Sequence, residues 1–197
     1  MFASLDSMEL NHDGLYFIHP FNTDSRKSVK DIYTEIVENG AQSDLERCFA
    51  IYSEEILKTN VQTYLTAFRE FEKEHQIEQT FDLSYSIKAN YNPNILKSIS
   101  KTGASFATTV SGNEIKLVEK CGYRNIIFNG TGKRLSEIET AVKMSNGMNV
   151  YINIDSEFDY NRIKQVDRRI ENNAKFLLRY NPDVEEMEGV QKVSEIF

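Results

Sequence analysis

The sequence has few of the residues that build disulfide, zinc or histidine-dependent sites. Its two cysteines, Cys48 and Cys121, lie far apart and outside any CxxC spacing, which excludes a disulfide framework and a zinc site. Both are expected to be ordinary thiols in a reducing cytosol. The three histidines are His12, His19 and His75, and no metal cluster or histidine-based triad can be assembled from them. We therefore expect no bound metal.

Long apolar runs and an excess of basic residues are also missing. The longest apolar runs, such as Ile126–Phe128 and Phe176–Leu178, are too short to cross a bilayer. The amino end has no basic stretch followed by an apolar core, so it does not indicate a secretory signal. With 30 acidic and 23 basic residues among 197, the net charge of -7 disfavours binding to the nucleic-acid backbone. We expect a cytoplasmic globular protein with no nucleic-acid or membrane partner.

From Cys48 onward, short β-rich runs alternate with amphipathic helical patterns. The predicted strands are Cys48–Tyr52, Phe81–Ile87, Ala104–Thr109, Asn125–Phe128, Asn149–Ile154 and Lys175–Tyr180. The predicted helices between them are Glu54–Glu74, Asn94–Ser100, Asn113–Lys120, Ser136–Met144 and Glu157–Ile170. No two of these strands meet in a hairpin, so they must be parallel and joined by crossovers. The fold class is therefore α/β, either a doubly wound open sheet or a barrel.

Residues 1–45 follow a different pattern. Leu15–Ile18 is typical of a strand, and the apolar residues Val29, Ile32 and Ile36 form the stripe of a helix that Gly40 would end. We interpret residues 1–45 as an amino-terminal strand-helix appendage and residues 46–197 as the main domain.

The segment from Phe81 to Lys88 points to a chemical role for its last residue. Large apolar side chains alternate with polar ones, which places Lys88 on the polar face at the carboxyl end of the strand. In parallel barrels the active site lies at that end. A desolvated lysine there is a candidate nucleophile that forms a Schiff base with a carbonyl compound. The alternative interpretation is a solvated lysine that ends a strand.

Arg179 occupies the same kind of position at the end of the predicted strand Lys175–Tyr180. Two cations at one end of a barrel favour a phosphorylated, carboxylate-bearing ligand. The alternative is that Arg179 pairs with one of the nearby acidic residues.

The loop Asn129–Lys133 (NGTGK) does not match the known phosphate-binding motifs. A Walker A loop needs glycine at position 127 and serine or threonine at 134, where this chain has Ile127 and Arg134. The dinucleotide fingerprint fails as well, because Leu135 stands where its third glycine is required. We interpret the segment as a flexible turn between a strand and a helix.

An ordered series of motifs around Lys88 resembles one family. Tyr85–Asn92 (YSIKANYN) is similar to the Tyr-x-x-Lys-x-Asn segment of the fold-type III decarboxylases that use pyridoxal phosphate. This group contains the diaminopimelate, ornithine and arginine decarboxylases. The similarity continues through Gly103–Phe106 (GASF), Ser111–Ile115 (SGNEI), Ile126–Lys133 (IIFNGTGK), Ile154–Ser156 (IDS) and Leu178–Asp183 (LRYNPD). It spans about residues 48 to 184 and looks most like the diaminopimelate branch.

The resemblance implies a fold, a cofactor and site residues. The fold would be an incomplete (β/α)8 TIM-type barrel of about six βα units, preceded by the amino-terminal appendage. Lys88 would hold pyridoxal 5'-phosphate as an internal aldimine, Arg179 would lie near the cofactor, and Ser111 would lie close to its ring. The implied reaction is decarboxylation of a basic or diamino amino acid in lysine biosynthesis. Members of this family form homodimers, so a homodimer is expected for the full-length form.

Two alternatives remain open. An inactive homologue would keep the barrel for binding or regulation, which is favoured because Phe106–Ser111 contains no carboxylate and has Ala107 where the family carries an acid. A racemase-like or cofactor-carrier barrel fits the fold but fits the motifs at Ser111 and Arg179 less well.

Length adds a further expectation. A complete barrel takes roughly 250 residues, and six strands are used by Tyr180. We therefore expect the chain alone to be aggregation-prone, to be reorganised, or to be a non-functional gene fragment, with the ring-stacking, phosphate-binding and substrate-selecting residues beyond Phe197.

Overall fold

The structure is a computed structural model that describes residues 8–11, 14–19, 22–39 and 52–179. The predicted strand at 48–52 lies outside these residues except for Tyr52, and so do Gly40 and the predicted domain boundary at residue 45. None of the helices in the described ranges combines the length and apolarity that a membrane span requires.

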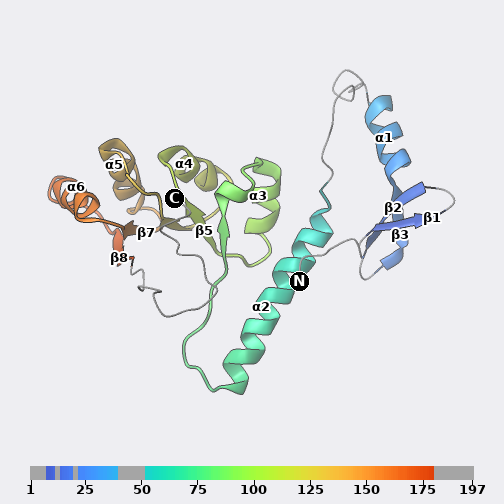
Figure 1. The fold of residues 1–197 in the computed structure, drawn as a ribbon, viewed down its shortest axis with the longest axis horizontal. Helices are drawn as coiled ribbons and strands as arrows, with labels where there is room; N and C mark the ends of the chain where they lie inside the picture. The colour runs from blue at the N-terminus through green and yellow to red at the C-terminus, as the bar shows by residue number, and fades with distance from the viewer. Residues whose placement is uncertain (1–7, 12–13, 20–21, 40–51, 180–197) are drawn as a thin grey trace, which may run out of the picture. The chain divides into compact units, whose positions relative to one another are not determined.

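Residues 8–39 form a small antiparallel sheet followed by a helix (Figure 1). Strand β2 (Gly14–His19) lies between β1 (Met8–Asn11) and β3 (Asn22–Ser28), and α1 (Val29–Glu38) follows directly. Ser28 caps this helix, since its hydroxyl accepts the Asp31 N–H at 2.9 Å while the Asp31 carboxylate accepts the Ser28 N–H at 3.2 Å. The predicted strand and helix are confirmed, whereas β1 and β3 were not predicted from the sequence.

The rest of the described chain alternates helix and parallel strand (Figure 1). The five parallel strands lie in the order β4-β5-β6-β7-β8. Their bounds are β4 Ser84–Ser86, β5 Phe106–Thr109, β6 Asn125–Phe128, β7 Asn149–Ile154 and β8 Lys175–Leu178. The helices are α2 Glu54–Glu74, α3 Pro93–Ser100, α4 Gly112–Lys120, α5 Leu135–Met144 and α6 Glu157–Asp167. The α/β prediction is confirmed.

The predicted strand Phe81–Ile87 is longer than the observed one. Strand β4 covers Ser84–Ser86, and Ile87–Ala89 forms a 3-10 turn, η3. Upstream of β4, the Phe81 N–H donates to the Glu72 carboxylate of α2. At the amino end of the predicted strand, the Glu72 carboxylate therefore binds the backbone in place of a neighbouring strand. At its carboxyl end, a 3-10 turn begins instead.

The chain divides into two compact units, each with its own apolar core. The first contains α2, α3 and β4, and its core joins Val61, Ile95, Ile99 and Ala104. The second contains β6, β7, α5 and α6, and fully buried side chains of all four elements form its core. They are Ile126, Phe128, Ile138, Ala141, Val142, Val150, Ile152, Ile163 and Val166. The buried strand residues Ile126, Phe128, Val150 and Ile152 lie on one face of β6 and β7. The opposite face is therefore available for polar side chains.

Polar pairs join β6 and β7 on that other face. The Asn149 amide donates to the Asn125 side-chain oxygen at 2.8 Å, and the Asn153 amide donates to the Asn129 side-chain oxygen. Asn125 and Asn149 are also direct partners in the strand register. Each pair joins residues 24 positions apart, so both amide bonds require the same alignment of the two strands.

Burial predicts a large difference between two identical substitutions. Leu96 in α3 is 0% exposed, whereas Leu178 in β8 is 81% exposed. We expect Leu96→Ala to lower the free energy of unfolding by about 2–5 kcal/mol because it leaves a cavity. Leu178→Ala is the matched control and should change it by less than about 0.5 kcal/mol. Chemical denaturation measures both, and equal effects would contradict the burial described here.

Candidate active site

Each of the three predicted site residues follows the carboxyl end of a parallel strand. Lys88 lies in η3 directly after β4, Ser111 follows β5 by two residues, and Arg179 follows β8. Lys88 belongs to the first compact unit, while Ser111 and Arg179 belong to the second. Their local surroundings are therefore described separately.

Lys88 is an exposed amine on a well-anchored turn. Ile87 beside it is fully buried, whereas Lys88 itself is exposed. Within the described part of the chain, its Nζ atom has neither a carboxylate partner nor a hydrogen bond. An amine that is not engaged in an ion pair can react with an aldehyde, which is the chemistry expected of this residue.

Position 107 does not lie on the polar side of β5. Ala107 is fully buried and pairs in register with Tyr85. Its neighbour Thr108 pairs with Ser86, and its hydroxyl lies 2.7 Å from the Ser84 hydroxyl. Thr108 is therefore the residue of β5 that shares a face with the serines of β4, and this face carries hydroxyls at that level.

Ser111 caps the helix that follows β5. Its hydroxyl oxygen accepts the Glu114 N–H at 3.3 Å, and its carbonyl accepts the Ile115 N–H at 3.1 Å. The Glu114 carboxylate in turn accepts the Val110 N–H at 2.7 Å. These bonds hold Ser111, a half-buried residue, at the start of α4.

Arg179 lies beside a carboxylate at the end of the neighbouring strand. Its N–H donates to the Ile154 carbonyl at 3.1 Å, which continues the pairing of β8 with β7. Its guanidinium Nη1 lies 3.6 Å from Asp155 Oδ1, and the side chain is 41% exposed. The alternative stated from the sequence, that Arg179 pairs with a nearby acidic residue, is therefore confirmed. The guanidinium is nevertheless partly exposed to solvent.

A buried lysine that the sequence pattern did not single out organises this edge of the sheet. Lys133 ends the loop after β6, and its side chain is 0% exposed. Its Nζ atom lies 2.9 Å from Asp159 Oδ2, 3.2 Å from Asp155 Oδ2, and 5.6 Å from the centroid of the Phe128 ring. The loop was predicted to be a flexible turn; instead, its last residue is held by two carboxylates. Lysine side chains are usually exposed and are buried only when they are paired. Hydrophobic periodicity therefore does not predict the burial of Lys133.

The same loop passes close to the loop that carries Ser111. The Asn129 N–H donates to the Thr109 carbonyl at 2.8 Å. A Cβ atom added at Gly130 would overlap the Val110 carbonyl oxygen and lie 3.0 Å from its carbon. Glycine is therefore required at position 130 for the two loops to approach this closely.

Glu137 ties the starts of two helices together. Its carboxylate accepts the Gly112 N–H of α4 and the Arg134 N–H before α5, each at 3.0 Å. Partial burial opposes ionisation, but the two backbone hydrogen bonds and the Arg134 charge outweigh it and lower the pKa of Glu137. The charged form of Glu137 therefore stabilises the folded state.

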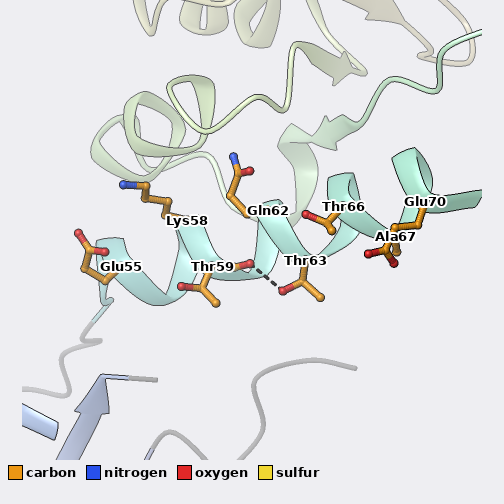
Figure 2. A pocket seen from close by; sticks show the side chains of 8 residues that line it. All are labelled: Glu55, Lys58, Thr59, Gln62, Thr63, Thr66, Ala67 and Glu70. Atoms are coloured by element: carbon orange, nitrogen blue, oxygen red, sulfur yellow. Dashed lines mark hydrogen bonds between the residues drawn. The ribbon is translucent and has the colours of Figure 1, made fainter. Parts of the chain in front are cut away.

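A surface hollow of about 600 Å³ lies along α2, and none of the predicted site residues lines it. Figure 2 shows its lining side chains, all of which come from this one helix, including Lys58, Gln62 and Thr66. The Gln62 amide is engaged with the Thr102 carbonyl, and the Thr63 hydroxyl donates to the Thr59 carbonyl at 2.9 Å. Because these polar groups serve the helix and its neighbour, the hollow presents no converging set of reactive groups.

The parallel strands β4 to β8 define an α/β domain, and domains of this class place their functional sites at the carboxyl ends of the strands. Residues 62–194 match the family described as pyridoxal-dependent decarboxylase, pyridoxal binding domain. The chain belongs to this pyridoxal-dependent decarboxylase family. The predicted cofactor, pyridoxal phosphate, is confirmed for this domain, and the exposed Lys88 amine and Arg179 guanidinium suit its aldehyde and its anionic group.

Individual relatives agree with this assignment. A probable chloroplastic diaminopimelate decarboxylase from rice (Oryza sativa subsp. japonica) is 38% identical over 105 residues, which cover 52% of this chain and 20% of the relative. The crystal structure of diaminopimelate decarboxylase from M. jannaschii has a TM-score of 0.68 at 24% identity, covering 90% of this chain and 36% of that one. A second M. jannaschii structure, in co-complex with L-lysine, has a TM-score of 0.54 at 30% identity, with coverage of 63% and 28%.

These similarities confirm the predicted barrel-type α/β fold class and the resemblance stated from the motifs. The chain spans between 20% and 36% of the length of these three relatives.

The close approach at Gly130 predicts a steric effect. We expect Gly130→Ala to lower the free energy of unfolding by about 2 kcal/mol or more, because the backbone of Val110 would have to move. Gly147→Ala is the matched control, since a Cβ atom there meets nothing nearer than 4.0 Å. Thermal or denaturant unfolding measures the difference, and a Gly130→Ala variant as stable as the control would refute the packing of these two loops.

The lowered pKa of Glu137 predicts a pH-dependent contribution to stability. A carboxylate whose pKa is lower in the folded state stabilises the fold above its unfolded pKa, and this contribution disappears as the pH falls through the folded value. We expect Glu137→Gln to cost about 1 kcal/mol near neutral pH, and the difference from wild type to shrink between about pH 6 and about pH 3. Glu139→Gln, which leaves both backbone hydrogen bonds of Glu137 in place, is the matched control on the same helix. Urea unfolding at a series of pH values measures it, and a constant difference would contradict the role of Glu137.

Proposed function

We propose that this chain is the cofactor-binding part of a decarboxylase that removes carbon dioxide from a basic or diamino amino acid, with diaminopimelate as the favoured substrate. One observation carries the proposal. An exposed and unpaired lysine amine, Lys88, follows directly after a parallel strand within the region that matches the pyridoxal-binding domain.

Lys88 has the chemistry needed to hold the cofactor. Its Nζ atom would form the covalent link to the aldehyde carbon of pyridoxal phosphate. When bound, this cofactor supplies an electron sink that stabilises the negative charge left as carbon dioxide departs. The buried Ile87 fixes the backbone from which the lysine extends, so the amine stays at the carboxyl end of β4.

Arg179 and Ser111 would bind and orient the ligand. The Arg179 guanidinium is partly open to solvent and can pair with a phosphate or carboxylate group. The Ser111 hydroxyl already accepts the Glu114 N–H, so its proton can be donated to a ligand. These two residues therefore offer one charged and one neutral donor.

The favoured substrate comes from the relatives. The rice and M. jannaschii proteins are diaminopimelate decarboxylases by name, and one M. jannaschii structure contains L-lysine. Lysine is what diaminopimelate becomes when it loses one carboxylate as carbon dioxide. Diaminopimelate and lysine both carry two amino groups, so these relatives favour a substrate of that kind.

We further propose that residues 1–45 form an appendage to a barrel domain that begins near residue 46. A cytoplasmic location and a homodimeric full-length form complete the proposal.

Labelling with the cofactor tests the role of Lys88. We expect pyridoxal phosphate followed by borohydride to modify Lys88 in wild type, because its amine is exposed and unpaired. Peptide mapping by mass spectrometry should find the label there, and Lys88→Ala should lose it. Lys101→Ala, which removes another exposed lysine, should leave the label on Lys88 unchanged.

Carbon dioxide release from diaminopimelate is measured alongside. Release together with labelling would support the decarboxylase directly, while labelling alone is what the cofactor-binding part of such an enzyme should show. Absence of label from Lys88 would favour a binding or regulatory homologue, in line with the hydroxyl-lined face at Thr108. Labelling spread evenly over the exposed lysines would reject the assignment of Lys88.

A further inference from the structure

The buried ammonium of Lys133 and the guanidinium of Arg179 share one carboxylate. Asp155 uses Oδ2 for Lys133, at 3.2 Å, and faces Arg179 with Oδ1, at 3.6 Å. The Asp155 side chain is 11% exposed, so the interaction with Lys133 is buried, whereas Arg179, at 41% exposed, approaches from the solvent side. The two cations therefore compete for the same negative charge from opposite sides.

The distances show which cation holds the carboxylate. Lys133 is within hydrogen-bond range of both Asp155 and Asp159, whereas 3.6 Å is too long for a hydrogen bond from Arg179. Asp155 Oδ1 is buried and has no hydrogen-bond partner among the described residues. The Arg179 guanidinium therefore lies near Asp155 Oδ1 without forming a hydrogen bond to it.

The charges explain how this arrangement persists. Asp155 and Asp159 together carry two negative charges, and Lys133 supplies one positive charge from the buried side. Without Lys133, Arg179 would be the remaining cation recorded beside these carboxylates in the described part of the chain. The stronger attraction would then draw it onto Asp155.

Backbone contacts hold Lys133 firmly enough for this role. Its carbonyl accepts a hydrogen bond of 2.5 Å from Arg162, whose guanidinium lies 4.0 Å from the centroid of the Phe158 ring. Asp159 is fixed by the capped first turn of α6, because its N–H donates to the Ser156 hydroxyl at 3.2 Å.

We propose that Lys133 is a positioning residue for Arg179: by neutralising Asp155 from its buried side, it keeps the guanidinium open to an anionic group of the ligand. This proposal rests on the proposed function for the identity of that ligand, but the state of Arg179 can be measured without it.

The experiment measures the rate at which phenylglyoxal modifies Arg179 in the full 197-residue chain, with mass spectrometry to assign the site. The double variant Lys133→Met, Asp159→Asn removes one charge of each sign. We expect it to lower the rate at Arg179 by about two- to fivefold, as Arg179 closes onto Asp155. Asp155→Asn should raise the rate by a similar factor, because the competing carboxylate is gone.

Controls separate positioning from a general loss of structure. Asp159→Asn alone leaves Lys133 on Asp155, so the rate at Arg179 should not fall. Arg124, which is exposed, provides the internal reference rate in every sample. If the double variant does not fold, Lys133→Gln takes its place, because it removes the charge while its amide can still donate to the carboxylates. It should likewise lower the rate at Arg179.

Opposite responses of the double variant and Asp155→Asn support the proposal, because a purely structural cluster would change the rate in one direction. Equal rates in all folded variants overturn it.

Affinity for pyridoxal phosphate is then measured in the same variants. If the rates respond as expected but the affinity does not, the assignment of Arg179 to the cofactor fails while the positioning stands. If Lys88 is labelled but the rates do not respond, the positioning fails while the proposed function stands.

Discussion

A lysine ammonium that is withdrawn from water must have its charge met by nearby carboxylates, and this requirement governs the edge of the sheet after β6, β7 and β8. The charge of Lys133 is compensated by Asp155, which follows β7, and by Asp159, which lies in the first turn of α6. Removing one member of such a cluster leaves an uncompensated buried charge, which typically costs about 3–5 kcal/mol. The positions of the strand ends are thus coupled through electrostatics as well as through backbone pairing.

Close backbone contact supplies the second constraint. Gly130 allows the loop after β6 to reach the Val110 carbonyl, and the Glu137 carboxylate joins the starts of α4 and α5. Ser111 lies between Val110 and Gly112, so its position depends on Gly130 and Glu137. The two loops therefore behave as one support for the residues that follow β5 and β6.

Much of this architecture was accessible from the sequence, for definite physical reasons. The bounds of α2, β6 and β7 are the predicted ones, because long amphipathic periodicity and short β-rich runs are strong local signals. Strand β3 (NTDSRKS) was missed since it has no apolar alternation. Strand β4 is shorter than predicted at both ends, because the Phe81 N–H is bound by the Glu72 carboxylate and a 3-10 turn begins at Ile87. The strand-end positions of Lys88, Ser111 and Arg179 followed from alternation and motif order. The burial of Lys133 did not, because it depends on carboxylates more than 20 residues away.

The paired asparagines on β6 and β7 have a consequence for how the sheet selects its alignment. Apolar side chains tolerate a range of neighbours, whereas an amide that loses its partner loses a defined hydrogen bond. The pairs Asn125–Asn149 and Asn129–Asn153 share one offset, so a slipped pairing of the two strands would break both at once. The polar face therefore helps to fix the register of β6 against β7 and to exclude misaligned strands during folding.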